Sequence, residues 1–130
     1  SIATIMFFFS CKKEDTPTIV GKWNLVSNRS KIVATQGSTT IYNQDTTEYF
    51  SSGSYVDFRS NGTYTMNDNS SSEDGNYTVN NNKITIISSS DTTTLDILNL
   101  QSNSAQLYLK DYDDNSGIVT NYEFWINMTK

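Results

Sequence analysis

Hydrophobic and polar residues alternate along most of this chain in short runs separated by turn-forming residues. From Ile19 onward nine such runs follow one another: IVGKWNLVS, TTIYNQDTTEYF, YVDFRS, TYTMN, GNYTVN, KITIIS, TTTLDILNL, AQLYLKD and IVTNYEFWINM. A period of two puts alternate side chains on opposite faces of a strand, so each run predicts a strand with one buried and one solvated face. The strongest turn signal is Asn61-Gly62, because both residues tolerate positive φ in a two-residue hairpin turn.

The alternation also predicts which side chains share the buried face: Phe58, Tyr64, Met66, Ile84, Ile86, Leu107, Leu109, Tyr122, Phe124 and Ile126. It breaks at residues 95–100, where leucine and isoleucine occur at both parities, which predicts a β-bulge. Residues 28–54 leave three alternatives open: a long loop, a short helix or a strand pair. A meander of eight or nine strands exposes two edges unless it closes. We therefore predict an all-β fold, an antiparallel up-and-down meander closed into a barrel of about eight strands.

The amino-acid composition and net charge of the chain exclude several classes of function. The 130 residues suit one domain, and Ser, Thr, Asn and aromatic residues dominate, as in β-proteins with polar turns. A net charge of -5, with no basic cluster beyond Lys12 and Lys13, argues against a nucleic-acid partner. The sequence has no histidine, which excludes Ser-His and Cys-His nucleophile pairs and imidazole zinc sites. We expect no enzyme activity, no catalytic residue, no cofactor and a monomeric protein.

The N-terminal residues predict export and lipid attachment. Residues 2–9 are apolar apart from Thr4, a run too short to cross a bilayer core of about 30 Å as a helix. Ser10 and Cys11 follow, and four charged residues come directly after them. This order resembles the lipobox of bacterial lipoproteins, which implies a signal-peptide remnant at 1–10, a lipidated Cys11 with a flexible tether at 11–18, and a folded domain at 19–130. The alternative is an ordinary buried thiol.

Residues Lys13, Glu14 and Asp15 resemble the short charged signal that follows the lipidated cysteine in surface lipoproteins of some Gram-negative bacteria. The resemblance implies an outer-membrane lipoprotein of the cell envelope that is exposed at the cell surface. Attachment on the periplasmic side stays open.

Two stretches of the domain resemble the lipocalins. Gly21-Lys22-Trp23 resembles their Gly-x-Trp signature, and residues 58–64, FRSNGTY, resemble the short lipocalin-like domains found in bacterial lipoproteins. The sequence shows no counterpart of the arginine that caps the family's tryptophan. The resemblance implies an eight-stranded barrel in which Trp23 packs across the closed end, against Phe124 or Ile126 of the last strand.

The barrel interior is the candidate site for a small apolar or amphipathic ligand. Its predicted lining is Trp23, Phe58, Tyr64, Met66, Tyr77, Leu107 and Phe124. A barrel this small can also be filled by its own side chains. The alternative function is then a surface module that binds protein or glycan through exposed aromatic residues such as Tyr108 and Trp125.

The run DYDDNSG, residues 111–117, is a weak candidate for a metal-binding loop. Asp111, Asp113 and Asn115 have the one-three-five spacing of a calcium loop. The glycine is one position late and the twelfth position is Tyr122, so a polar hairpin loop explains the run better. We expect no metal site.

We predict that Cys11→Ala in the full-length gene product moves the protein out of the membrane fraction, because the substitution removes the acylated thiol. Fractionation of host cells and mass spectrometry of the mature N-terminus measure this outcome. A variant that stayed membrane-bound would contradict the lipoprotein interpretation.

Overall fold

The computed structural model describes residues 16–130, and nine antiparallel strands with their connecting turns make up this part of the chain. The predicted segments 1–10 and 11–15, with Cys11 and the Lys13-Glu14-Asp15 signal, lie outside the described residues. The strands are β1 (Gly21–Gln36), β2 (Thr39–Tyr49), β3 (Tyr55–Phe58), β4 (Thr63–Asn67), β5 (Ser72–Asn80), β6 (Lys83–Ile87), β7 (Thr92–Leu98), β8 (Ser104–Asn115) and β9 (Ile118–Thr129).

Eight of these strands close into a barrel. They pair in the order β1-β3-β4-β5-β6-β7-β8-β9, and β9 returns to pair with β1. β2 lies outside this ring, where it pairs with β1 from Ser27 to Gln36. The predicted all-β antiparallel barrel is therefore confirmed, with one additional strand.

The vaguely patterned residues 28–54 form a strand pair, one of the three alternatives. The second half of β1 and β2 are joined at Gly37, whose φ of 61° lies in the left-handed region that favours glycine. Most β2 side chains are exposed, so no hydrophobic alternation marks this strand in the sequence.

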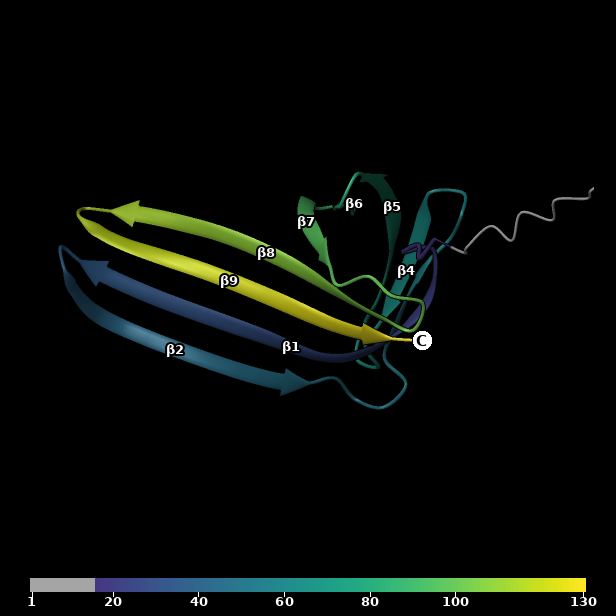
Figure 1. The fold of residues 1–130 in the computed structure, drawn as a ribbon, viewed down its shortest axis with the longest axis horizontal. Coiled ribbons are helices and arrows are strands. Elements are labelled where there is room, and N and C mark those ends of the chain that lie inside the picture. The colour runs from purple at the N-terminus through teal and green to yellow at the C-terminus, as the bar shows by residue number, and fades with distance from the viewer. Residues whose placement is uncertain (1–15) are drawn as a thin grey trace, which may run out of the picture.

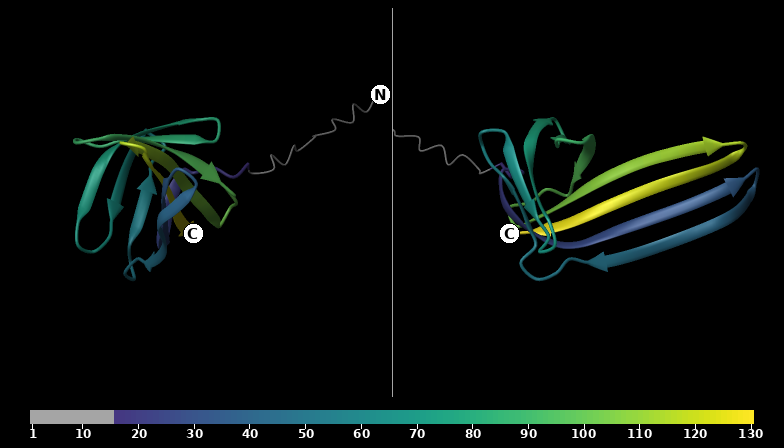
Figure 2. Two further views of the ribbon diagram at one scale, coloured as in Figure 1. Left: turned by 90° about the vertical axis from the view of Figure 1, so that its left-hand side faces the viewer. Right: turned by 180° about the vertical axis from the view of Figure 1, so that it is seen from behind.

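Four strands extend well beyond the barrel (Figures 1 and 2). β3 pairs with β1 only from Gly21 to Asn24, whereas β9 pairs with β1 from Asn24 to Gln36 and with β8 along the length of both strands. The result is a four-stranded sheet in the order β2-β1-β9-β8. We call it the projecting sheet and define it by residues 28–36, 39–48, 118–126 and 107–115.

A bulge in β1 sets the faces of the projecting sheet. Leu25 lies opposite Met128 and Ser27 lies opposite Asn127, so Val26 is an extra residue in the ladder. Before the bulge the odd-numbered residues Trp23 and Leu25 point into the barrel, and after it the even-numbered residues do, because the extra residue shifts the alternation by one.

Two local predictions are wrong. Residues 95–100 contain no bulge, because β7 pairs in regular register and ends at Leu98, and Asn99 turns the chain with a φ of 52°. Asn61-Gly62 is not a two-residue turn, because four residues connect β3 to β4 and Gly62 alone of the pair has positive φ, 85°. A tight turn with positive φ at both positions occurs instead at Ser116-Gly117.

Aromatic side chains fill the barrel near the start of β1. Trp23 and Phe58 are fully buried, and the Phe58 ring meets the edge of Tyr77 at a centroid distance of 5.1 Å. The buried core comprises Ile19, Trp23, Leu25, Val56, Phe58, Tyr64, Tyr77, Ile84, Leu95, Ile97, Ala105, Leu107 and Met128. This end of the barrel is closed by side chains.

Trp23 is held by groups from both ends of the domain. Its Nε1 donates to the Ile19 carbonyl oxygen at 2.8 Å, and the ammonium of Lys130 lies 4.5 Å from the ring centroid. Gly21 has a φ of 131°, and a Cβ at this position would lie 3.0 Å from Lys130 Nζ. The glycine of the Gly-x-Trp motif therefore lets the lysine pass over the tryptophan.

The expected packing of Trp23 against Phe124 or Ile126 is wrong. These residues lie opposite Ser30 and Asn28, seven and five positions along β1 from Trp23. At about 3.3 Å per residue, Phe124 is roughly 20 Å away. The ammonium of Lys130 instead lies over the Trp23 ring. The expectation that the first and last strands are neighbours is confirmed.

Tyr64 carries an unpaired polar group in this core. It is buried, and its hydroxyl has no hydrogen-bond partner among residues 16–130. Gly75 lies opposite on β5, where a Cβ would come within 2.7 Å of the Tyr64 ring. Burial, with the nearby Glu73 carboxylate, raises the pKa of Tyr64 to about 12.

We predict that Trp23→Ala lowers the free energy of unfolding by about 3 to 5 kcal/mol, because it removes a fully buried aromatic side chain. Trp125→Ala should cost only about 1 kcal/mol, because this half-buried ring loses surface contacts with Arg29 and Tyr108. Urea titrations of both variants measure the difference. Equal or reversed losses would contradict the assignment of strand faces.

Tyr64→Phe should raise the free energy of unfolding by about 1 kcal/mol at pH 7, because it deletes an unpaired buried hydroxyl. Unfolded tyrosine loses its proton near pH 10, so the stability from protonated Tyr64 is complete below pH 10 and is lost as pH rises through about 12. The variant should therefore lose less stability over this range. Urea titrations from pH 7 to 11 test both points.

The matched control is Tyr77→Phe, because the Tyr77 hydroxyl donates to the Arg59 carbonyl oxygen at 2.6 Å. This variant should be less stable than the natural protein at pH 7. A gain for Tyr77→Phe together with a loss for Tyr64→Phe would refute the assigned hydroxyl environments.

Candidate functional site

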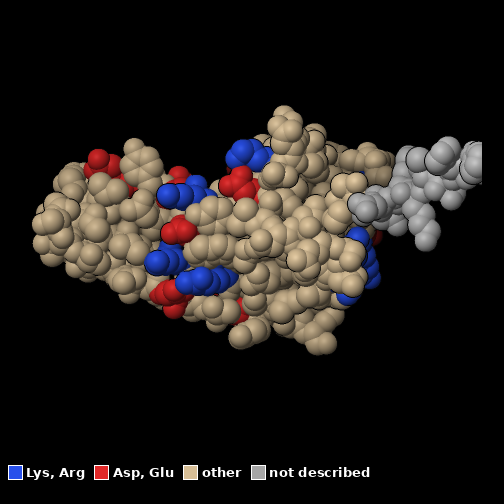
Figure 3. Space-filling view, viewed as in Figure 1, with Lys and Arg blue, Asp and Glu red and all other residues tan. Residues whose placement is uncertain are grey.

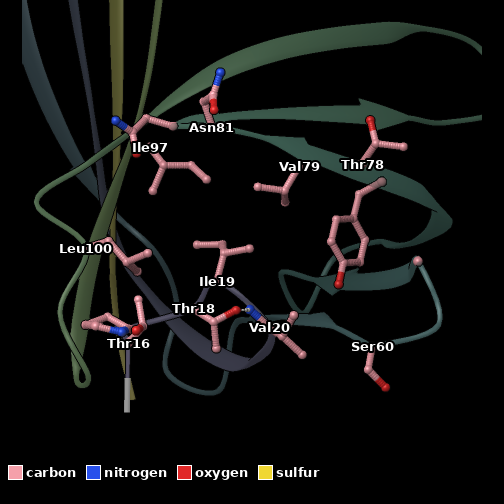
Figure 4. A pocket seen from close by; sticks show the side chains of 14 residues that line it. Thr16, Thr18, Ile19, Val20, Ser60, Thr78, Val79, Asn81, Ile97 and Leu100 are labelled. Carbon is pink, nitrogen blue, oxygen red and sulfur yellow. Dashed lines mark hydrogen bonds between the residues drawn. The ribbon is translucent and has the colours of Figure 1, made fainter. Parts of the chain in front are cut away.

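Pockets lie at both ends of the barrel. The first, of about 490 Å³, lies at the closed end, beside residues 16–20. Figure 4 shows the side chains of Ile19, Val79, Ile97 and Leu100 converging on it. We call it the tether-end pocket, because the chain enters the domain here.

The second pocket, of about 500 Å³, lies where the projecting sheet leaves the barrel. It is lined by Asn28, Ser30, Glu48, Leu95, Leu109, Phe124, Trp125 and Ile126. We call it the mouth pocket, because β1 leads away from the closed end toward it. Phe124 is 39 % exposed, so a large apolar ring faces this space uncovered.

Two rows of opposed residues build the mouth pocket. Glu48, Asn28, Ile126 and Leu107 lie opposite one another across β2, β1, β9 and β8, and Thr46, Ser30, Phe124 and Leu109 form the next row. Residues directly opposite each other share a face of a sheet, so both rows continue the barrel interior. We call this side of the projecting sheet the inner face.

Polar groups occupy one side of the mouth pocket and apolar groups the other. Asn28, Ser30 and Glu48 come from β1 and β2, whereas Leu95, Leu109, Phe124 and Ile126 come from β7, β8 and β9. Glu48 is the only charged residue among those that line this pocket. The arrangement is suited to an amphipathic molecule, because small-molecule pockets are mostly apolar with a few placed polar groups.

The seven predicted lining residues fall into three places. Trp23, Phe58, Tyr64 and Leu107 are buried in the packed core, and Met66 packs against it half-buried. Tyr77 belongs to the same core and also lines the tether-end pocket. Phe124 alone of the seven lines the mouth pocket. Their role in ligand binding stays a prediction.

Sequence reasoning missed most of the mouth pocket. The alternation of hydrophobic residues predicts Leu109 and Ile126 on the buried face, and this is the signal that could identify them as pocket residues. Glu48, Asn28 and Ser30 gave no such signal, because they lie in the segment with the weakest pattern.

The opposite side of the projecting sheet, which we call the outer face, carries a self-contained set of contacts. Arg29 makes a bidentate ion pair with Asp45, at 2.9 Å from Nε and 2.6 Å from Nη2. The hydrogen bonds from Arg29 lower the pKa of Asp45. The Arg29 guanidinium also lies 4.7 Å from the centroid of Trp125, which contacts Tyr108 at 5.3 Å. Tyr108 donates to Glu123 at 2.8 Å.

Alternating charges cross the outer face in a single row. Asp45, Lys31, Glu123 and Lys110 lie opposite one another on β2, β1, β9 and β8. Figure 3 shows a band of blue and red side chains that crosses the strands of the projecting sheet. Each acid faces a base, so this row balances its own charge.

The described residues contain no group of three or more His, Cys, Asp or Glu side chains placed to hold a metal ion. The run considered as a calcium loop is mostly strand, because β8 continues to Asn115 and the turn is confined to Ser116 and Gly117. Within residues 16–130, no helix has the length and apolar character needed to cross a membrane.

A comparison with protein families agrees with this architecture. The family model described as Lipocalin-like domain matches residues 19–107, which is more than half of the chain. No curated protein and no solved structure matches significantly. The match begins beside the closed end at Ile19 and stops within β8. Together with the closed eight-stranded barrel, it shows that the chain belongs to the lipocalin-like domain family.

Proposed function

We propose that this protein is a lipid-anchored binder of a small apolar or amphipathic molecule, which it holds in the mouth pocket. The observation that carries the proposal is the pocket of about 500 Å³ at the open end of a lipocalin-like barrel, with Phe124 exposed in its wall. Its volume is within the range of small-molecule sites.

The packing of the core supports the mouth rather than the deep interior as the binding place. Trp23, Phe58 and Ile84 are fully buried, and Met128 is 1 % exposed, so side chains already fill the barrel interior beneath the tether-end pocket. Ligand binding deep in the barrel would require these packed side chains to move, at a cost in stability. The apolar wall of Leu95, Leu109 and Ile126 offers contact area without such rearrangement.

The outer face gives less support to the alternative of a protein-binding or glycan-binding module. The aromatic residues that the sequence offers for that role are Trp125 and Tyr108. Both are half-buried, and they contact each other and Arg29 or Glu123. A partner would have to displace these contacts before it could stack on either ring.

The placement of the chain entry suits attachment through Cys11. Residues 16–20 enter the domain at the closed end, and the mouth pocket lies at the other end of the barrel. In an outer-membrane lipoprotein of the cell envelope this geometry would point the mouth away from the bilayer. The proposal is that the protein is monomeric and exposed at the cell surface. It binds its ligand without catalysing a reaction, and it has no nucleic-acid partner.

We predict that Phe124→Ala weakens binding of the neutral fluorescent probe N-phenyl-1-naphthylamine roughly tenfold, because the pocket loses its largest apolar contact. Fluorescence titration of the purified domain measures the dissociation constant. Tyr112→Ala is the matched control, because Tyr112 is an exposed aromatic residue on the outer face of the same sheet. Equal binding by both variants and the natural protein would contradict the mouth pocket as the site.

A further inference from the structure

We infer that the mouth pocket selects molecules with a cationic head group, an amine or quaternary ammonium carried on an apolar body. This inference rests on the proposed function and names its ligand class. It follows from the way the projecting sheet separates its charges between its two faces.

The inner face carries acids and no base. The charged residues at inner-face positions are Glu48 on β2 and Asp111 and Asp113 on β8, which share their parity with Leu107 and Leu109. No lysine or arginine of the projecting sheet, all of which is described, occupies an inner-face position. A ligand in the mouth pocket therefore meets negative charge alone on this sheet.

All three bases of the projecting sheet lie on the outer face. Arg29 and Lys31 reach it because the bulge at Val26 shifts the alternation of β1, and Lys110 lies opposite Glu123. Without the extra residue, Arg29 and Lys31 would share the parity of Trp23 and Leu25 and would point toward the mouth. The bases also face acids on their own side, as Arg29 does with Asp45 at 2.6 Å.

Glu48 is the acid that lies at the pocket itself. It lies opposite Asn28, and both residues line the pocket across from Phe124 and Ile126. Among the described residues, Glu48 forms no ion pair and no side-chain hydrogen bond within the protein. A cationic head group near this carboxylate would leave the attached apolar chain against Leu95 and Leu109.

Aromatic rings on the same face suit a cation as well. Phe124 and Tyr122 lie at successive inner-face positions of β9, and Phe124 is exposed in the pocket wall. The negative face of an aromatic ring attracts ammonium groups, and aromatic residues are used to recognise quaternary ammonium ligands. Neither an anion nor a neutral head group would gain from this combination.

The test compares three probes with the same eight-carbon chain: octylammonium, 1-octanol and octanoate. Each is titrated below its micelle-forming concentration into the purified domain by isothermal calorimetry at pH 7 and low salt. We expect octylammonium to bind about tenfold more tightly than octanol, and octanoate to bind most weakly. The ratio of ammonium to alcohol affinity should shrink when salt is raised, because part of it is screened electrostatics.

Two variants with the same change in net charge separate the site from general electrostatics. Glu48→Gln should bring the ratio of ammonium to alcohol affinity close to one. Asp114→Asn should leave the ratio at its natural value, because Asp114 is exposed on the outer face of the same sheet. Thermal melts check that both variants fold.

The outcomes distinguish the two levels of the argument. Octanol binding without a preference for octylammonium, or a ratio unchanged by Glu48→Gln, would overturn the cation selectivity and leave the proposed function standing. An equal fall of the ratio in both variants would also overturn it, because net charge alone would then explain the preference. If none of the three probes bound, the proposed function would fail and the inference with it.

Discussion

The pairing of β1 with β9 is the constraint on which the rest of this molecule depends. Its first part, beginning at Asn24 and Thr129, closes the barrel, and the same ladder continues to Gln36 and Ile118 as the middle of the projecting sheet. One ladder therefore builds both the packed domain and the surface beyond it. This ladder joins the first strand of the barrel to the last. The barrel therefore cannot close until nearly the whole chain has folded.

The bulge at Val26 divides this ladder into two parts with different uses. On the barrel side, Trp23 and Leu25 enter the core, and Lys130 covers the tryptophan. Beyond the bulge, the other parity of β1 faces inward, which places Ser30 in the mouth pocket and Arg29 on the outer face. The bulge, one extra residue in the β1–β9 ladder, therefore determines which charged side chains of β1 face the mouth pocket.

The residues that stabilise the fold and the residues proposed to bind the ligand lie at different ends of the barrel. The buried core combines the aromatic residues Trp23, Phe58, Tyr64 and Tyr77 with aliphatic side chains, and its burial stabilises a domain of this size. The open end leaves Phe124 uncovered, at a cost in hydrophobic stabilisation that a bound apolar molecule would offset. Substitutions at the mouth should therefore alter binding with little effect on folding, and substitutions near Trp23 should do the reverse.

The sequence by itself determined most of the strands and the meeting of the first strand with the last, because strand alternation is a local signal. It left residues 28–54 open and gave the wrong packing partners for Trp23. It could not determine the mouth pocket. The simple alternation that places Trp23 inside also places Arg29 and Lys31 inside, and only the pairing with β9 reveals the extra residue that turns them outward. Similarly, Phe124 alternates as a core residue, but its burial depends on whether another strand covers it, and β3 to β7 are too short to reach. Register and strand length relative to neighbours are properties of the assembled sheet, so only the tertiary structure decided them.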